Sequence, residues 1–441
     1  MTYASSRISR RTAVQAGSAA ALAATLGANT RAIGAAQDAV EIEYWHINTE
    51  SFGLSAVQRI IELFQEEYPH ITVVERFQTN SYTELLERVQ TSMVAQTPPD
   101  VCQVGYSYLD YVARNFPFST IDSLVEENGD QEFMGAFEDN ILELGRIGGD
   151  LVGMPYGFSN MVVYFNAEQV TEAGYDPANM PTTWEEFREM AVAVNANTGQ
   201  PPIYIQVSDD NWATQTMIDS NGGSLVRCDE GSVKAGFDQP EAVEAIQFWA
   251  DLAADGLALV ANADQGQQAF FTQNVTFAFQ SIARRGNFES EASFDLQACA
   301  VPGFGDKSPK LTTGGNCLFV FSQDDAKKQA AWEFIKFCSS PAAQTVWVEE
   351  TGYLPTRNDV ADDPEYLQEF IQGNAIQQVA FNQSDVAAPW TSFPGNNGLQ
   401  VGMELASAVE GALSGGQSAE EALGRAAEIA NQLLEGETCE L

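Results

Sequence analysis

The strongest constraint on the fold is a change of hydrophobic period that repeats between Val40 and Val104. Residues 40–45 and 71–74 have the pattern of strands and residues 101–104 that of a short core strand. The two segments between them carry apolar side chains at helical spacing, around residues 57–64 and 85–93. This order predicts a parallel sheet with helices on its faces. Ligands collect at the carboxyl ends of such strands, which here are residues 46–50, 80–82 and 105–107.

A second set of elements follows the first sheet. The chain of 441 residues exceeds the size at which one core usually keeps growing, so we expect two lobes. A helix should open at Thr183, with Glu186 completing a capping box. We also expect strands at residues 203–205, 275–279 and 317–321, helices at 242–252 and 330–338, and a polar turn at 280–282.

The charge of the chain is strongly acidic. There are 61 acidic and 21 basic residues, a formal net charge of −40, and six of the bases are lysines. Such an excess disfavours nucleic acid and anionic membranes as partners, because affinity for phosphates comes from cations. The acids are spread along the chain, which favours a surface that must stay hydrated in high salt. We therefore expect a halophilic source, against the alternative of an ordinary acidic secreted protein.

The N-terminus has the order of an export signal. Arg10 and Arg11 precede an uncharged Ala/Gly-rich run over residues 12–30, which predicts a twin-arginine signal over residues 1–36. No later apolar run approaches the ~20 residues that span a bilayer. We expect an extracellular or periplasmic protein, with anchoring by an uncleaved signal left open.

Cysteine and histidine are sparse and unpatterned. The six cysteines include no C-x-x-C pair, and only His46 and His70 accompany them, so we expect no metal site. Six cysteines allow 15 pairings, which the sequence leaves open. Cys102 and Cys317 fall in expected core strands, so buried free thiols are at least as well supported for them as disulfides.

Four segments in register resemble a known family. Residues 153–166 read as a strand, a polar turn and a second strand; residues 314–320, 351–355 and 426–434 follow in the same order. From about Val40 to the C-terminus the chain resembles the solute-binding proteins of carbohydrate ABC importers, and most closely the glycerol-3-phosphate-binding group. The resemblance implies an α/β, two-lobed periplasmic-binding-protein-like fold, with a ligand cleft between two mixed sheets flanked by helices. It implies lobes at 38–153 plus 312–352 and at 154–311 plus 353–441.

The resemblance also implies a ligand site. Sugar and polyol sites combine aromatic faces, which pack on C–H groups, with converging polar groups that fix hydroxyls. The candidate ligand-binding residues, from the family motifs and from aromatic residues at strand ends or crossings, are Tyr82, Tyr106, Ser159, Trp212, Ser281, Gly315, Tyr353 and Trp390. The alternatives are plainly structural: a helix-capping or hinge tyrosine, turn-forming serines, a core tryptophan and a glycine needed for close packing.

Two departures from the family pattern bear on the ligand. The family's acidic contact falls near Tyr106, where no carboxylate stands, and its phosphate-gripping arginine should fall within residues 393–398. No arginine occurs between Asn358 and Gly424. Arg284 and Arg285 are possible substitutes, although we expect an exposed helical pair. A neutral sugar or oligosaccharide therefore ranks above glycerol-3-phosphate.

The function that this resemblance implies is binding without chemistry. Two lobes would close over the solute and present it to ABC permease subunits, and we expect a monomer without a cofactor. The main alternative is a secreted carbohydrate-active enzyme, which needs two carboxylates about 5–10 Å apart. No G-x-S-x-G, H-E-x-x-H or phosphate loop is present. A structural adhesin would be expected to show strand repeats, and none are visible.

Overall fold

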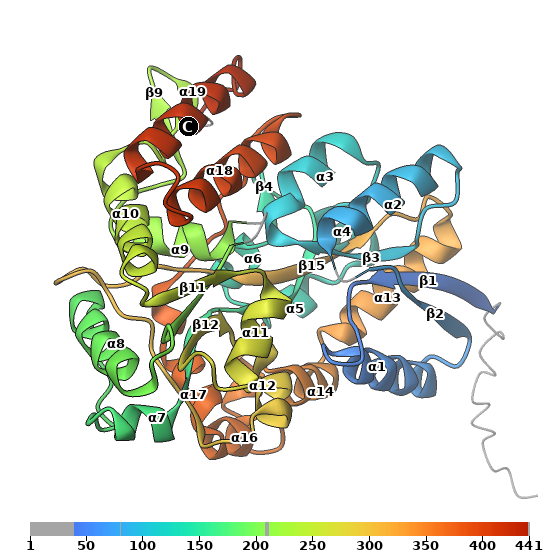
Figure 1. The fold of residues 1–441 in the computed structure, drawn as a ribbon. Coiled ribbons are helices and arrows are strands. Elements are labelled where there is room, and N and C mark those ends of the chain that lie inside the picture. The colour runs from blue at the N-terminus through green and yellow to red at the C-terminus, as the bar shows by residue number, and fades with distance from the viewer. Residues whose placement is uncertain (1–38, 80, 208–210, 440–441) are drawn as a thin grey trace, which may run out of the picture. The chain divides into compact units, whose positions relative to one another are not determined.

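The computed structural model describes residues 39–79, 81–207 and 211–439, and its largest sheets are two mixed five-stranded ones (Figure 1). The first has the order β2-β1-β3-β15-β6. Its strands are β1 (Val40–His46), β2 (Ile71–Phe77), β3 (Val101–Gly105), β6 (Met154–Ser159) and β15 (Gly314–Val320). β1 pairs in parallel with β2 and β3, whereas β15 runs antiparallel to β3 and β6. The parallel pairing of β1, β2 and β3 confirms the prediction of a parallel sheet from alternating strands and helices.

Helices surround this sheet because their apolar faces need a partner. Ile60 and Phe64 of the first helix, for example, are almost fully buried. The elements here are α1 (Leu54–Glu67), α2 (Tyr82–Val94), η1 (Tyr106–Tyr108), α3 (Leu109–Asn115), α4 (Ile121–Asn128), α5 (Gln131–Met134), α6 (Asp139–Glu143), α13 (Asp325–Cys338), α14 (Pro341–Thr351), and the hairpin of β4 (Arg146–Ile147) and β5 (Asp150–Leu151).

The second sheet has the order β11-β8-β12-β7-β13. Its strands are β7 (Met161–Asn166), β8 (Ile203–Gln206), β11 (Ala258–Ala261), β12 (Phe277–Ser281) and β13 (Leu296–Cys299). Around it lie α7 (Ala167–Glu172), α8 (Trp184–Thr198), α9 (Trp212–Ser220), α10 (Pro240–Ala254), α11 (Ala263–Phe271), η2 (Ile282–Arg284), α12 (Arg285–Glu291), α15 (Asn358–Ala361), α16 (Gln368–Gly373), α17 (Ala375–Asn382), η3 (Ser384–Val386), α18 (Gly398–Leu413) and α19 (Ala419–Leu433). Two short pairs join β9 (Val226–Asp229) to β10 (Ser232–Ala235) and β14 (Leu311–Thr312) to β16 (Ala387–Ala388).

The chain passes between the sheets where the sequence places polar turns or glycines. β6 belongs to the first sheet and β7 to the second, with only the buried Asn160 between them. The chain returns from β13 to β15, and Leu354 makes an isolated bridge with Phe158 after α14. The strand–turn–strand prediction for residues 153–166 is therefore confirmed.

Several predicted boundaries move. The strand predicted at residues 275–279 is β12, and it contains Gln280 and Ser281, which the sequence suggested as a turn; pairing with β7 continues as far as Met161. β15 begins three residues earlier than predicted. Thr183 caps α8 by accepting from the Glu186 amide at 3.3 Å, but the structure gives only this half of the capping box.

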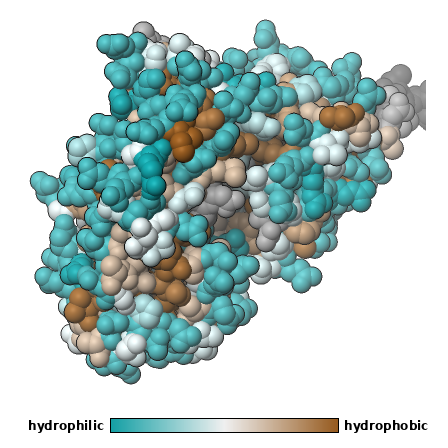
Figure 2. Space-filling model, turned by 45° about the horizontal axis from the view of Figure 1, so that its top comes forward, coloured by the Kyte–Doolittle hydropathy of each residue, from teal (hydrophilic) through white to brown (hydrophobic). Residues whose placement is uncertain are grey.

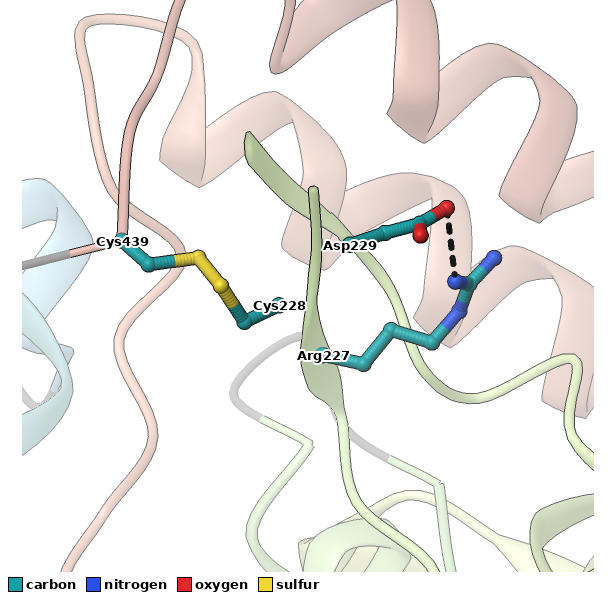
Figure 3. The surroundings of a disulfide bond; sticks show 4 residues. All are labelled: Arg227, Cys228, Asp229 and Cys439. Atoms are coloured by element: carbon teal, nitrogen blue, oxygen red, sulfur yellow. Dashed lines mark hydrogen bonds and ion pairs between the residues drawn. A yellow bond between two sulfur atoms is a disulfide. The ribbon is translucent and has the colours of Figure 1, made fainter. Parts of the chain in front are cut away.

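Packed apolar residues fill both halves of the described chain, and the face in Figure 2 is mostly hydrophilic with scattered hydrophobic patches. None of the helices in the described ranges has the length and apolarity needed to cross a bilayer. Cys102 and Cys317 are buried free thiols, one of the two states that the sequence left open. Among the pairings left open, the structure joins Cys228 on β9 to Cys439 beyond α19 (Figure 3).

Candidate ligand-binding site

A cavity of about 290 Å³ lies where strands of both sheets end. Its lining includes the last residues of β3, β6, β8 and β12, and the first of β15. The structure brings all eight candidate residues from the sequence into the lining of this one cavity: Tyr82, Tyr106, Ser159, Trp212, Ser281, Gly315, Tyr353 and Trp390. We call it the candidate site.

Two tyrosines enter the site from the first sheet. Tyr82 opens α2, and its ring lies so close to Gly105 that a Cβ there would be 2.9 Å from Cδ2. Tyr106 follows β3, and its hydroxyl donates to the Gly157 carbonyl at 3.2 Å. Burial raises the pKa of both phenols well above the ordinary value. They are neutral at physiological pH and contribute to the lining of the site.

The two serines are neighbours although 122 residues separate them. Ser281 Oγ, at the end of β12, donates to Ser159 Oγ, at the end of β6, at 2.9 Å. Ser281 Oγ also accepts from the Ala283 amide at 3.2 Å, which caps η2. The pair thus links strands of the two different sheets. A ligand hydroxyl could join this pair, because each hydroxyl oxygen has two acceptor lone pairs.

Gly315 allows the backbone to approach closely at the same edge. Its φ is +129°, and a Cβ would lie 2.0 Å from the Gly157 carbonyl oxygen and 3.0 Å from the Tyr106 ring. Only glycine fits such a position without strain. Gly315 is therefore needed for close packing, the structural alternative given above, and it also lines the candidate site.

Trp212 and Tyr353 are rigidly held aromatic walls. Trp212 opens α9, and its indole Nε1 donates to the Thr312 carbonyl at 2.8 Å. Tyr353 stacks on Trp347 with ring centroids 5.3 Å apart, and burial raises its pKa to about 12. Both are more than nine-tenths buried, so each combines core packing with a face or edge in the site.

Trp390 lies in a loop that is held in place by hydrogen bonds to Gln215. The Gln215 side chain, fully buried, donates to the Pro389 carbonyl and to Thr391 Oγ1, both at 3.1 Å, and accepts from the Thr391 amide at 3.0 Å. These bonds hold the residues on either side of Trp390. The position of this ring could not be read from its own sequence context.

Arg284 corrects the expectation of an exposed arginine pair. It ends η2, lines the site, and its guanidinium lies 4.2 Å from the centroid of the Phe52 ring. Burial lowers the pKa of this guanidinium, and among the described residues no carboxylate oxygen lies within 4.0 Å of it. The neighbouring Arg285 is 3% exposed; its Nη1 donates to Glu289 Oε2 at 2.6 Å and its Nε to Gln377 Oε1 at 3.0 Å. Arg285 is buried because its helix, α12, packs against α14, whereas Arg284, in η2 beside α17, is partly buried.

The sequence did not single out several further lining residues. Gln206 ends β8, Gln280 precedes Ser281, and the two side chains are hydrogen-bonded to each other. The rule that ligands lie at strand ends could have found Gln206. Phe52 and Gln267 come from segments with no motif, and nothing in their local sequence would have found them.

Charge is unusually scarce in the site. Arg284 is the one charged residue among the described lining residues, in a chain with 61 acids. The segment 393–398, where the family's arginine was expected, lies beside a neighbouring cavity instead. In the described ranges no group of three His, Cys, Asp or Glu side chains is placed to hold a metal ion.

Comparison with known proteins identifies the family. Residues 59–370 match the model for bacterial extracellular solute-binding proteins, which is more than half of the chain. The chain belongs to this family. Relatives of this solute-binding protein include the sn-glycerol-3-phosphate-binding periplasmic protein UgpB of Escherichia coli, 23% identical over 439 residues and covering 93% of this chain and 96% of its own. The counterpart in Pectobacterium atrosepticum is 22% identical, covering 90% and 92%.

Solved structures show the same fold for this solute-binding protein. UgpB from Mycobacterium tuberculosis, in complex with glycerophosphocholine, aligns with a TM-score of 0.80 and 21% identity, over 90% of this chain and 98% of its own. The cyclic alpha-maltosyl-1,6-maltose binding protein from Arthrobacter globiformis aligns with a TM-score of 0.76 and 24% identity, over 90% and 99%. The two-lobed solute-binding fold with two mixed sheets, expected from the sequence, is confirmed.

Proposed function

We propose that this protein captures a sugar or polyol outside the membrane and delivers it to the permease subunits of an ABC importer. The observation that carries the proposal is the lining of the candidate site. Aromatic rings, two hydrogen-bonded serines and two glutamine amides converge there from both sheets. Rings pack against the C–H faces of a sugar, and the hydroxyl and amide groups fix its hydroxyls.

Delivery would depend on closure of two lobes about the passages between the sheets. We assign the lobes expected from the sequence, 38–153 plus 312–352 and 154–311 plus 353–441, with one change: residues 154–159 form β6 of the first sheet and join the first lobe. Because β6 pairs with β15, the first passage itself lies at Asn160. A ligand that touches both lobes favours the closed form by its differential affinity for that form.

Binding without chemistry is favoured over hydrolysis. A glycosidase of the usual kind needs two carboxylates flanking the scissile bond. Among the described residues that line the candidate site there is no aspartate or glutamate. Product formation on incubation with oligosaccharides would overturn this part of the proposal.

The test is calorimetric titration and thermal unfolding with neutral sugars and polyols. A ligand specific for the folded state adds about 2.7 kcal/mol to the free energy of unfolding at one hundred times its dissociation constant, and the midpoint temperature rises accordingly. Trp212→Ala should abolish the shift, and Tyr353→Phe, which keeps the stack on Trp347, should weaken binding about tenfold through one lost hydrogen bond. Absence of a shift with every neutral sugar and polyol would contradict the proposal.

A second candidate, a phosphorylated polyol such as glycerol-3-phosphate, is favoured by Arg284. A partly buried guanidinium with no carboxylate oxygen within 4.0 Å among the described residues suits a phosphate, which it can hold with two parallel hydrogen bonds. Arg284→Gln should then abolish binding of glycerol-3-phosphate. If the ligand is a neutral sugar, the same substitution should reduce affinity only several-fold.

We propose export through the twin-arginine pathway and action as a monomer, with anchoring by an uncleaved signal as an alternative. The paired Arg10 and Arg11 support the pathway, and they lie outside the described residues. Replacing both with lysine should leave the protein inside the cell, whereas it should reach the medium or cell surface when they are intact.

A further inference from the structure

The two lobes face each other at a second cavity, of about 230 Å³, beside the candidate site. Tyr108 and Tyr111 line it from the first lobe, and Phe393 and Met403 line it from the second. We call it the outer cavity, and Trp390 belongs to the linings of both cavities. Opening of the lobes would separate the walls of the outer cavity, so contacts that cross from wall to wall oppose opening.

Two side-chain contacts join the lobes in this region. Ser392 Oγ, in the loop that contains Trp390, donates to the Ser107 carbonyl at 3.2 Å. Glu437 Oε2, near the C-terminus, lies 3.9 Å from Nη1 of Arg114 on α3. The first contact joins a loop of the second lobe to η1, and the second joins the C-terminal tail to α3. Opening of the lobes would break both.

The tail that carries Glu437 is fixed to the second lobe. We call residues 434–439 the C-terminal strap. Its backbone pairs with the β9–β10 hairpin, where the Val233 amide donates to the Glu437 carbonyl at 3.0 Å. The disulfide between Cys439 and Cys228 then ties the end of the strap to β9 (Figure 3). Chain ends are poorly ordered unless they are tied down, so these two attachments decide where the Glu437 carboxylate lies.

Both partners of the ion pair are oriented by their own lobe. Arg114 Nε donates to the two carboxylate oxygens of Asp110, one turn earlier on α3, at 2.9 and 2.8 Å. Glu437 packs against Gly395, where a Cβ would collide with the carboxylate. A strap that only stabilised the second lobe would need the strand pairing and the disulfide, but no charge directed at α3.

We propose that the C-terminal strap is a latch, which the Cys228–Cys439 disulfide holds in place and which favours the closed form by presenting Glu437 to Arg114. The inference rests on the lobe closure in the proposed function and adds a device that sets how much closed form exists before a solute arrives. A larger closed fraction raises the apparent affinity for a solute that needs that form. A dithiol reductant would release the latch: it becomes a disulfide itself and leaves two thiols on the protein.

The test measures the distance between the lobes in the absence of any solute. Spin labels are placed on Thr91 of α2 and Ser407 of α18, both exposed, and pulsed electron paramagnetic resonance gives the distribution of their separation. The labels are attached through a non-natural amino acid, so that the cysteines remain unmodified. Because no solute is needed, the measurement does not depend on which sugar the protein binds.

The variants separate the charge of the strap from its attachment. Glu437→Gln removes the carboxylate and keeps the disulfide. Glu435→Gln removes the same charge from an exposed residue of the same strap and is the matched control. Cys228→Ser and the wild type treated with dithiothreitol both detach the strap. If Cys228→Ser destabilises the protein, Glu437→Gln still tests the latch.

We expect the fraction of molecules with the longer separation to rise about two- to fivefold in Glu437→Gln, which is the size of effect that a partly exposed ion pair gives. Detaching the strap should raise it at least as much. Arg114→Gln should match Glu437→Gln, and the double variant should exceed neither, because the two charges act through one contact. Glu435→Gln should match the wild type.

Four results would overturn the latch: no change in Glu437→Gln, an equal rise in Glu435→Gln, additive effects of Arg114→Gln and Glu437→Gln, or a wild type that is already fully open without solute. None of them bears on sugar capture, which the calorimetric titrations decide. Failure of every sugar to bind would overturn the proposed function, and the distance measurement would still decide the latch.

Discussion

At the scale of single residues, Gly315 carries both the packing of the first sheet and the shape of the candidate site. Its φ of +129° and the 2.0 Å approach of a would-be Cβ to the Gly157 carbonyl leave no space for a side chain. Gly129 also has positive φ, +72°, but a Cβ there meets nothing within 4 Å. A side chain at Gly129 would meet only backbone strain, whereas one at Gly315 would meet both strain and a steric clash.

We expect Gly315→Ala to lower the free energy of unfolding by about 3 kcal/mol, from strain and overpacking together. Gly129→Ala should cost only about 1 kcal/mol, because strain acts alone. Urea unfolding of the two variants measures the difference. Equal costs would show that β15 and β6 move apart to accept the methyl group.

His46 is a second residue whose surroundings make a prediction. It is buried at the end of β1, its Nε2 lies 2.8 Å from Glu75 Oε1, and its Nδ1 accepts from the Asn48 amide at 3.1 Å. Burial lowers the pKa of His46 below its ordinary value of 6.5, although Glu75 opposes the shift. Between the two pKa values, the imidazole of His46 is therefore protonated in the unfolded chain and neutral in the native protein.

The stability due to neutral His46 is fully present above about pH 6.5 and is lost as pH falls below it. We expect His46→Gln to lose less unfolding free energy than the wild type between about pH 7.5 and about pH 5.5. Chemical unfolding at the two pH values measures this. His70→Gln, at the only other histidine, is the control and should behave as the wild type. An unchanged pH dependence in His46→Gln would contradict the account.

At the scale of elements, the C-terminal segment is tied to the β9–β10 hairpin. α18 and α19 pack on α10 as a helical pair, and Ser418 and Glu421 form a capping box at the start of α19. Beyond it, the Val233 amide donates to the Glu437 carbonyl at 3.0 Å and the Cys439 amide to the Gly231 carbonyl at 3.1 Å. The disulfide to Cys228 closes a loop with a sequence separation of 211.

Closing so long a loop restricts the unfolded chain, so we expect Cys228→Ser to lower the free energy of unfolding by about 2–4 kcal/mol. Cys299→Ser, at a free cysteine, should have a much smaller effect. Thermal unfolding with and without reductant measures the effect, and only the wild type and Cys299→Ser should respond to reductant. A wild type insensitive to reductant would show that the bond is absent or without energetic weight.

At the scale of the whole molecule, the acidic surface is only partly neutralised. Three of the six lysines lie on α13, where Lys327 pairs with Asp100, Lys328 with Glu127 and Lys336 with Asp130, at 2.9–3.0 Å. Half of the lysines thus lie on one helix beside the first sheet. With 61 acids against 21 bases, most carboxylates have no cation to pair with, and their mutual repulsion opposes folding.

We expect the unfolding temperature to rise strongly when potassium chloride is raised from about 0.1 M to about 1 M, as the screening length falls from about 10 Å to about 3 Å. Glycine betaine at the same osmolality is uncharged overall and should produce a smaller rise. Scanning calorimetry distinguishes the two. An equal effect of salt and betaine would argue against charge repulsion, and with it against the proposed adaptation to brine.

The sequence by itself predicted the alternating elements and most strands of the two sheets, and its resemblance to the family supplied most of the eight candidate residues that line the site. Hydrophobic periodicity reports which face of each element is buried, and strand ends report where a ligand cleft opens. Only the tertiary structure decided that Arg284 turns inward onto Phe52, that Cys228 meets Cys439, and that Trp390 stands between two cavities. Each of these depends on elements far apart in the chain packing together, and local pattern carries no information about which distant surfaces will meet.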